Sequence, residues 1–374
     1  MPVTTAPVPT QHVNAEHVNT QHVNTAHRPE LRRNDYSLGE EQADVQAAFT
    51  ELFTRECPTS RVREAEPLGH DEGLWRSLVR TGAATMGLPE ALGGGGASPL
   101  DLALVAEAAG RHVAPVPLIE ASVALRLLAV AAPDLARTWI GGALEDGRFP
   151  TLALHPVAPD GARQLVPAGA VTGAVIALTG EELALHDGEP APLVENQGRA
   201  PVAWWQPSSG GRTVVAEGDR ARVLYAAAVR EWKLLTAAAL SGIGEGALAL
   251  GLDFVKDRTA FDTPIGAFQA ISHALADAHT GVVGARNLAR KAAWFAGSEP
   301  DARPELVPMA FAYAAQAATK AVTVATHVQG GFGFTVESDV QLYFRRAKGW
   351  SVLAGDPRAE LSAIGDLLAD RVKG

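Results

Sequence analysis

Residues 268–289 read FQAISHALADAHTGVVGARNLA, and the spacing of their apolar side chains decides the fold. Intervals of three and four residues alternate along this stretch, which is the spacing of one face of an α-helix. The residues on that face are Phe268, Ile271, Leu275, Ala278, Val282, Ala285 and Ala289. A stripe of this kind predicts a helix that packs against other helices in an antiparallel bundle.

Similar stripes lie on both sides of this helix. The preceding segment carries one from Trp232 to Gly246, and its small residues permit close approach of helix backbones. A third stripe runs through residues 306–324, and a last helix begins near Val340. Residues 226–374 are therefore predicted to form a four-helix bundle.

Upstream of the bundle the pattern changes twice. Residues 35–148 are helical in pattern, and Ser98 followed by Pro99 is a typical helix start. Residues 149–225 consist of short apolar runs broken by Gly, Pro and Asp, which predicts strands joined by tight turns. The predicted fold class is α+β, mainly α, with an N-terminal helical domain, a small middle β domain and the bundle.

Residues 1–34 carry an HVN repeat at five-residue intervals and little that would form a core. This composition predicts a flexible tail. The five-residue interval does not place the histidine rings on one helical face, and no cysteine accompanies them, so we predict no metal site there.

The composition narrows the class of protein. The chain has 374 residues, of which 47% are hydrophobic, and a net charge of −10, which favours a globular fold of more than one domain. The negative charge disfavours nucleic acid and anionic membranes as partners. Cys57 is the single cysteine, so an intrachain disulfide is excluded and a cytoplasmic location is expected.

Two segments of the bundle carry a resemblance to a known family. DRTAFDTPIGAFQAISHALAD (257–277) joins the first two predicted bundle helices, and HVQGGFGFTVESDVQLYFRRAK (327–348) follows the third. A weaker match is MGLPEALGGGGAS (86–98). Together with the order of the domains, these segments resemble the acyl-CoA dehydrogenase family of flavoenzymes over residues 36–374.

The resemblance implies FAD as cofactor and α,β-dehydrogenation of an acyl thioester as reaction. Arg258 would reach the pyrophosphate of an FAD bound by a neighbouring subunit, a role that suits the planar donor fork of a guanidinium group. Phe261 would flank the cofactor and Gln269 would hydrogen-bond it. Gly330 and Gly331 would let the backbone approach the adenosine diphosphate moiety closely.

Several family features are altered in this chain. The family's glutamine before the glycine pair is His327, with Gln329 beside the pair, and both are candidate cofactor contacts. Asp262 replaces a glycine and would place an acid near the pyrophosphate. The middle-domain segments that contact the flavin ring in the family are not visible in residues 151–164 or in the strands that follow.

The catalytic base is altered as well. In many family members a glutamate removes the α-proton of the thioester, and this position is Ala354, followed by the matching Gly355. Asp356 lies two residues further on. Other members carry the base on the first bundle helix, at a position that falls near Leu234, and Glu231 lies about one helical turn earlier.

Three interpretations remain open. Asp356 or Glu231 is a relocated base in a self-sufficient dehydrogenase, or the chain is a partner subunit that completes the cofactor site of a fuller subunit. In the third, the fold serves other flavin chemistry or is a non-catalytic interaction protein. We favour the partner subunit, because lost ring contacts together with retained interface segments are what a half-site contributor would show. The second subunit is then a related chain or another copy of this one.

Overall fold

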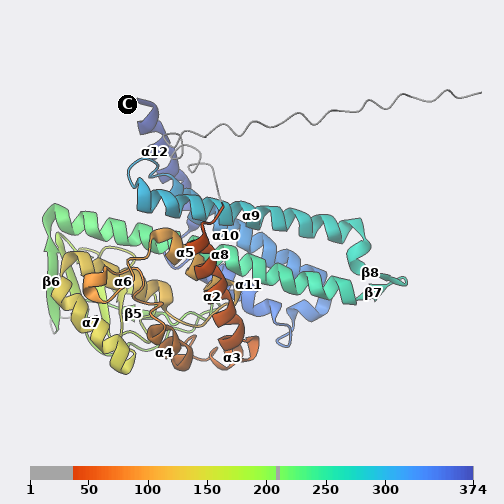
Figure 1. The fold of residues 1–374 in the computed structure, drawn as a ribbon, viewed down its shortest axis with the longest axis horizontal. Coiled ribbons are helices and arrows are strands. Elements are labelled where there is room, and N and C mark those ends of the chain that lie inside the picture. The colour runs from red at the N-terminus through yellow and green to blue at the C-terminus, as the bar shows by residue number, and fades with distance from the viewer. Residues whose placement is uncertain (1–36, 208–210, 374) are drawn as a thin grey trace, which may run out of the picture. The chain divides into compact units, whose positions relative to one another are not determined.

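The structure is a computed structural model that describes residues 37–207 and 211–373. The predicted tail and its HVN repeat lie outside the described residues. Helices come first, then short strands, then long helices, which confirms the predicted fold class (Figure 1).

The first described segment is helical. Ser98 begins one of its helices as predicted: its Oγ accepts a hydrogen bond from the Asp101 backbone N–H at 3.3 Å, and the Asp101 carboxylate accepts one from the Ser98 N–H at 2.8 Å. The elements are α2 (Glu40–Glu56), α3 (Thr59–Glu64), α4 (Glu72–Arg80), η2 (Glu90–Leu92), α5 (Pro99–Arg111), α6 (Leu118–Ala131) and α7 (Pro133–Asp146).

The middle segment forms a small sheet of order β1-β3-β4-β6, in which β1 runs parallel to β3 and the other neighbours are antiparallel. A separate antiparallel pair consists of β2 and β5. Strand β3 does not alternate between buried and exposed residues: five consecutive residues are buried, so both of its faces are covered. The strands are β1 (Pro150–Leu152), β2 (Gln164–Val166), β3 (Ala174–Thr179), β4 (Glu182–Asp187), β5 (Ala203–Trp205) and β6 (Arg212–Glu217).

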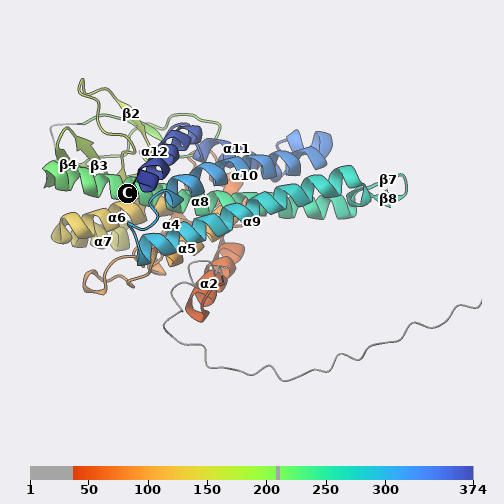
Figure 2. The same ribbon diagram turned by 90° about the horizontal axis from the view of Figure 1, so that it is seen from above.

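The last segment is dominated by three long helices that lie side by side in both ribbon views (Figures 1 and 2). On α9 the predicted stripe is buried from Leu275 to Ala289, whereas Phe268 at its start remains 38% exposed. The helices are α8 (Gly218–Asp257), α9 (Gln269–Ser298), α10 (Leu306–Val328), α11 (Val340–Trp350) and α12 (Glu360–Lys373). The short elements between them are β7 (Thr259–Ala260), β8 (Thr263–Pro264), η3 (Ile265–Ala267), η4 (Gly330–Phe334) and η5 (Pro357–Ala359).

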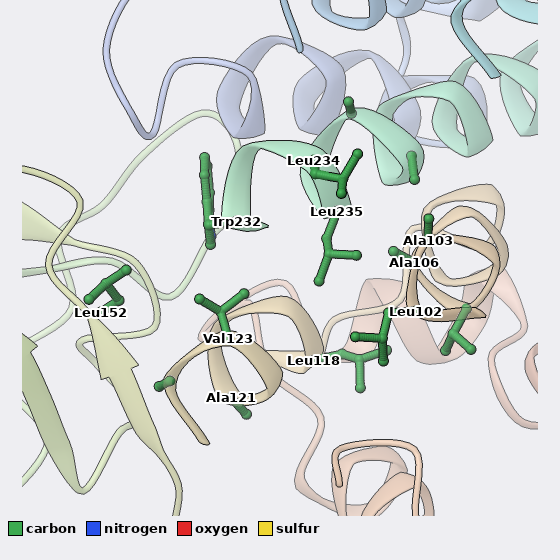
Figure 3. Packing of buried hydrophobic residues seen from close by; sticks show 14 of the residues in the cluster. Leu102, Ala103, Ala106, Leu118, Ala121, Val123, Leu152, Trp232, Leu234 and Leu235 are labelled. Carbon is green, nitrogen blue, oxygen red and sulfur yellow. The ribbon is translucent and has the colours of Figure 1, made fainter. Parts of the chain in front are cut away.

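Small residues bring α8 and α5 into backbone contact. A Cβ on Gly242 would lie 2.0 Å from the Glu107 carbonyl oxygen, and a Cβ on Gly110 would lie 2.0 Å from the Ala239 carbonyl oxygen. The predicted close approach along α8 is therefore confirmed, but its tightest partner is a helix of the N-terminal segment. Figure 3 shows buried side chains of α5, α6 and α8 that pack together in the core.

Two boundaries differ from the sequence prediction. The long helix α8 begins at Gly218, inside the segment predicted as strands up to residue 225. The predicted last helix is two helices, because Gly355 adopts a φ of +98° and Pro357 follows it. The predicted domain limits, residues 35–148, 149–225 and 226–374, stay predictions.

Among the described helices, α8 is long and apolar enough to span a membrane by length and composition alone. However, 83% of its apolar window is buried against the rest of the protein. It is therefore packed as the central helix of a protein core.

Candidate cofactor and active site

A tight hairpin closes the end of the bundle where α8 meets α9. Its two strands, β7 and β8, are joined by Phe261 and Asp262, which have φ angles of +53° and +58°. Two positive φ angles are what a type I′ turn requires, and aspartate adopts this conformation more readily than most residues. Asp262 can therefore replace the family's glycine without loss of the turn. Phe261 stands at the tip with 92% of its surface exposed.

Arg258 lies at the base of this hairpin, directly after α8. Its backbone is fixed, since its N–H donates to Phe254 O at 2.9 Å and its carbonyl accepts from the Ile265 N–H at 2.8 Å. The side chain is exposed, and its guanidinium group has no hydrogen bond or ion pair with any other described residue. A fixed backbone with a free cationic head is an arrangement suited to an external anion.

The glycine pair forms an open turn at the same end of the bundle. Gly330 has a φ of +60°, and a Cβ on either Gly330 or Gly331 would meet no described atom within 4 Å. The next residue, Phe332, stacks on Phe254 of α8 with ring centroids 6.3 Å apart and an interplanar angle of 10°. Because Phe254 lies one helical turn before Arg258, this contact places the glycine turn and Arg258 at one end of the bundle.

The remaining predicted cofactor residues divide into exposed and buried ones. Gln269 is the first residue of α9 and is exposed, and His327 is exposed in the last turn of α10. Gln329 is only 8% exposed, and its Oε1 accepts a hydrogen bond from Ser338 Oγ at 2.6 Å. The geometry therefore gives no support to a cofactor contact by Gln329, which stays a prediction.

This end of the bundle fits part of a flavin dinucleotide. Arg258 supplies a free guanidinium group for a pyrophosphate, and the turn at Gly330 and Gly331 leaves its backbone open to a ligand. The rings of Phe332 and Phe334 are 48% and 78% exposed beside that turn. The groups present would hold the phosphate and adenosine portions of FAD.

The turn after α11 is where the family glutamate would lie. Ala354 packs partly buried against the hydrophobic core, so a methyl group occupies the position. Asp356 is exposed and begins η5, where its carboxylate accepts from the Arg358 N–H at 2.9 Å and pairs with Arg358 Nη2 at 2.7 Å. These hydrogen bonds hold the pKa of Asp356 below its ordinary value. A carboxylate of lowered pKa is a weak base, so the geometry does not favour Asp356 as a catalyst.

Glu231 is tied to a different part of the molecule. Its Oε1 lies 2.6 Å from Nε of Arg126 on α6, and the pair lines an open groove of about 370 Å³ beside the loop of residues 87–97. Burial raises the pKa of Glu231, and Arg126 opposes this rise. None of the described residues of the turn 351–356 lines this groove. Asp356 and Glu231 both stay predictions as relocated bases, and both carboxylates are already paired.

The alternative family position for the catalytic base, near Leu234, is buried in the hydrophobic core. Leu234 is 1% exposed and lies in the core beside Leu235 and Trp232, as Figure 3 shows. A carboxylate introduced there would be buried without a counter-ion.

The sequence analysis missed a partly buried carboxylate that contacts α8. Glu120 lies in the first turn of α6, within the apolar run VPLIEASVAL (116–125), and Trp232 Nε1 donates a hydrogen bond to its Oε1 at 3.2 Å. Burial raises the pKa of Glu120. The single acidic residue within an apolar helical run could have indicated a functional or paired carboxylate. Its partner, Trp232, lies 112 positions away along the chain and could not be identified from local sequence.

Comparisons with known proteins identify the family of the two helical segments. The model of the acyl-CoA dehydrogenase N-terminal domain matches residues 39–144, and that of the C-terminal domain matches residues 227–368. The acyl-CoA dehydrogenase IpdE2 of Mycolicibacterium smegmatis is 30% identical over 336 residues, which cover 87% of this chain and 98% of IpdE2.

Two solved structures of paired chains are also similar. The Tcur3481–Tcur3483 steroid ACAD matches 90% of this chain and 100% of its own, with a TM-score of 0.78 and 28% identity. The ChsE4–ChsE5 complex of Mycobacterium tuberculosis matches 90% of this chain and 99% of its own, with a TM-score of 0.76 and 27% identity. The chain belongs to the acyl-CoA dehydrogenase family, whose members are FAD-dependent oxidoreductases.

Proposed function

We propose that this chain is the partner subunit of a heteromeric acyl-CoA dehydrogenase and completes an FAD site held mainly by a related, fuller subunit. The observation that carries the proposal is the contrast between a free Arg258 with an open glycine turn and an alanine at position 354. Solved relatives named as a complex or by two paired chains support an assembly of two different chains.

In this assembly the residues of this chain bind and orient the cofactor. Arg258 contacts the pyrophosphate, and the backbone at Gly330 and Gly331 lies against the adenosine portion. Phe261, at the hairpin tip, flanks the cofactor and shields it from water. A bound FAD would supply the hydride acceptor for the β-carbon of the acyl thioester, and the partner subunit would supply the carboxylate for the α-proton.

The experiment is co-production of this chain with the product of a neighbouring acyl-CoA dehydrogenase gene, followed by flavin absorbance and the mass of the complex. We expect the isolated chain to be colourless and the complex to be yellow. Arg258→Ala should weaken flavin binding by about tenfold to a hundredfold, since a hydrogen bond to a charged group is lost. Arg80→Ala, which removes an exposed arginine from the end of α4, is the matched control and should leave flavin content unchanged.

Each alternative has its own result. If the isolated chain is yellow, is a homo-oligomer by mass and reduces its flavin with an acyl thioester, the self-sufficient dehydrogenase replaces our proposal. Asp356→Asn and Glu231→Gln, made separately, then locate the base. If Arg258→Ala leaves the flavin content of every complex unchanged, the chain is an interaction protein on this fold.

We also propose a bulky acyl thioester as the substrate and the cytoplasm as the location. The steroid named for one similar structure supports a polycyclic acyl group over a straight chain. A panel of steroid-derived and straight-chain thioesters, assayed on the complex with an artificial electron acceptor, tests this. Higher kcat/KM with the straight chains would reject the polycyclic class while leaving the partner role intact.

A further inference from the structure

Three arginines surround one glutamate where α11 meets two loops of the preceding segments. We call Arg199, Arg345 and Arg346 the arginine cluster. Arg345 Nη1 donates to Glu66 Oε2 at 3.2 Å, and Arg346 Nη1 donates to Glu66 Oε1 at 3.5 Å. Arg199 Nε approaches Glu66 Oε2 to 4.0 Å. Three guanidinium groups therefore share one carboxylate, so positive charge is in excess at this place.

Two other carboxylates on the same segments are already paired with other arginines. Asp71 follows Glu66 in the connection between α3 and α4, and it accepts two hydrogen bonds from Arg61, at 2.7 and 2.8 Å. Asp339 lies directly before α11, and its Oδ1 is 2.6 Å from Nη2 of Arg63. These pairs neutralise their own charges, and they leave the excess charge of the arginine cluster uncompensated.

Arg346 is the most enclosed member of the cluster, with 0% of its surface exposed. Its Nη1 also donates to Leu342 O at 3.2 Å, but its Nε and Nη2 have no hydrogen-bond partner among the described residues. Burial lowers the pKa of Arg346 to about 10, and Glu66 opposes this fall, so the side chain is a cation at neutral pH. Buried charged donors are normally satisfied, because desolvation without an acceptor is strongly unfavourable. The two N–H groups therefore require an acceptor that the chain does not provide.

The loop that carries Arg199 is held rigidly beside the cluster. Arg199 has a φ of +49°, which is unfavourable for this residue type and persists only where the surroundings impose it. The Asn196 side chain donates to Ala200 O at 2.8 Å and accepts from the Ala200 N–H at 3.1 Å. A Cβ on Gly69 would lie only 2.4 Å from the Arg199 carbonyl oxygen. Arg199 Nε, like the two groups of Arg346, is buried without a hydrogen-bond partner among the described residues.

We propose that the arginine cluster binds a small monovalent anion of the size of chloride, which accepts hydrogen bonds from Nε and Nη2 of Arg346. An anion suits these donors because it compensates their charge as well as their hydrogen bonds. A compact ion is favoured over a phosphate ester, since the Arg346 side chain is completely enclosed. The bound ion would link α11 to the N-terminal segment and the loop of Arg199. This inference does not depend on the proposed partner role or on the flavin site.

The first experiment locates the ion. Crystals of the full chain, or of its complex, are grown without halide and soaked in sodium bromide, because bromide replaces chloride and is identified by its anomalous scattering. We expect a bromide peak in contact with Nε and Nη2 of Arg346. Ordered water at these two atoms, with no bromide, would overturn the proposal.

The second experiment measures the effect of chloride on stability in solution. Urea unfolding is followed while sodium chloride replaces sodium gluconate at constant ionic strength, so that screening stays the same. At chloride concentrations above the Kd, the unfolding equilibrium constant of the wild type should fall about tenfold for each tenfold rise in chloride, as expected for one ion bound only by the folded state. Arg346→Met keeps an unbranched side chain and should abolish this dependence. Arg63→Met, which removes a neighbouring arginine that is paired with Asp339, is the matched control and should retain it.

Glu66→Gln keeps the proposal testable if Arg346→Met does not fold. This variant removes the negative charge that competes with the anion, so half-maximal stabilisation should need about tenfold less chloride. Unchanged or weaker stabilisation by chloride in Glu66→Gln would contradict the proposal. The same chloride dependence in the wild type and Arg346→Met, or its loss in Arg63→Met as well, would show a general salt effect. Bromide in the crystal without chloride dependence in solution would show an adventitious ion only.

Discussion

The two ends of α8 present opposite environments. At the hairpin end, Arg258 has no partner among the described residues and the glycine turn is open. Along the first two-thirds of the helix, by contrast, Gly242 touches the backbone of α5, and Glu231 and Trp232 are paired with residues of α6. Polar groups whose hydrogen bonds are made within the chain stabilise the fold. Polar groups without a partner in the chain are available to a ligand or another chain. The predictions below test this difference, beginning with the largest effect.

Gly242→Ala should destabilise the chain by about 1–2 kcal/mol. The added Cβ would lie 2.0 Å from the Glu107 carbonyl oxygen, so the two helices must separate, and overpacking of this kind costs typically 1–3 kcal/mol or more. The gain in helix propensity from alanine, about 1 kcal/mol, offsets only part of this. Urea unfolding followed by circular dichroism measures the change.

Gly331→Ala is the matched variant at the open end. Its Cβ would meet no described atom within 4 Å, so the free energy of unfolding should change by less than about 0.5 kcal/mol. The same substitution should nevertheless weaken flavin binding by the complex. Equal destabilisation by Gly242→Ala and Gly331→Ala would show that the glycine turn is structural and would weaken the proposed cofactor role.

Arg126→Met should destabilise the chain by about 1–3 kcal/mol. It leaves Glu231 without its counter-ion and the Gly87 carbonyl oxygen without its donor. Loss of one partner of a buried pair costs about 3–5 kcal/mol, and we reduce this because the two side chains are 26% and 21% exposed.

The control is Arg137→Met, since Arg137 pairs with the almost fully exposed Asp134 on α7 and should contribute little. The double variant Arg126→Met with Glu231→Leu should recover part of the loss, because no charge is then left unpaired. A double variant that is less stable than Arg126→Met alone would contradict the role assigned to this pair.

Several of these features follow from the sequence and others do not. The stripe from Leu275 to Ala289 and the cap at Ser98 depend on neighbours within a few positions, and both were predicted correctly. The start of α8 at Gly218 was missed, because Gly-Asp after an apolar run is an ordinary turn signal and only packing against the sheet overrides it. The separate helix α12 after Gly355 was missed as well, although Gly and Pro two residues apart are typical of a boundary between helices.

In the candidate site, too, features that depend on local sequence were predicted and features that depend on distant residues were not. Local sequence segments that resemble the family contain Arg258, Gly330 and Gly331. These three residues could therefore be predicted as cofactor contacts from the sequence. The hydrogen bond between Trp232 and Glu120 joins two helices 112 positions apart, and no local pattern announces it. Gln329 is likewise buried and accepts a hydrogen bond from Ser338, nine positions away, and no local pattern predicts this pair.

The stability of the wild type relative to Glu120→Gln should fall as pH rises. Burial raises the folded-state pKa of Glu120, so between the unfolded pKa of about 4.3 and the folded value the unfolded chain loses its proton first. Within that pH window, the free energy of unfolding of the wild type minus that of Glu120→Gln should fall by at most about 1.4 kcal/mol per pH unit. At pH values below the window, this difference should be constant. Urea unfolding of both proteins from pH 4 to 8 measures it, and a difference that rises with pH would show that Glu120 is held ionised.

Asp356→Asn should have the smallest effect, with turnover of the flavin-loaded complex unchanged within about twofold. The carboxylate is exposed and bound to Arg358, and hydrogen bonding already lowers its pKa, so it is poorly suited to remove a proton. Asparagine keeps an oxygen that can accept from the Arg358 N–H and maintain the start of η5. The measurement is the steady-state kcat of the wild-type and Asp356→Asn complexes. A loss of about a hundredfold or more, the usual contribution of a general base, would identify Asp356 as the base. This chain would then have a complete active site of its own.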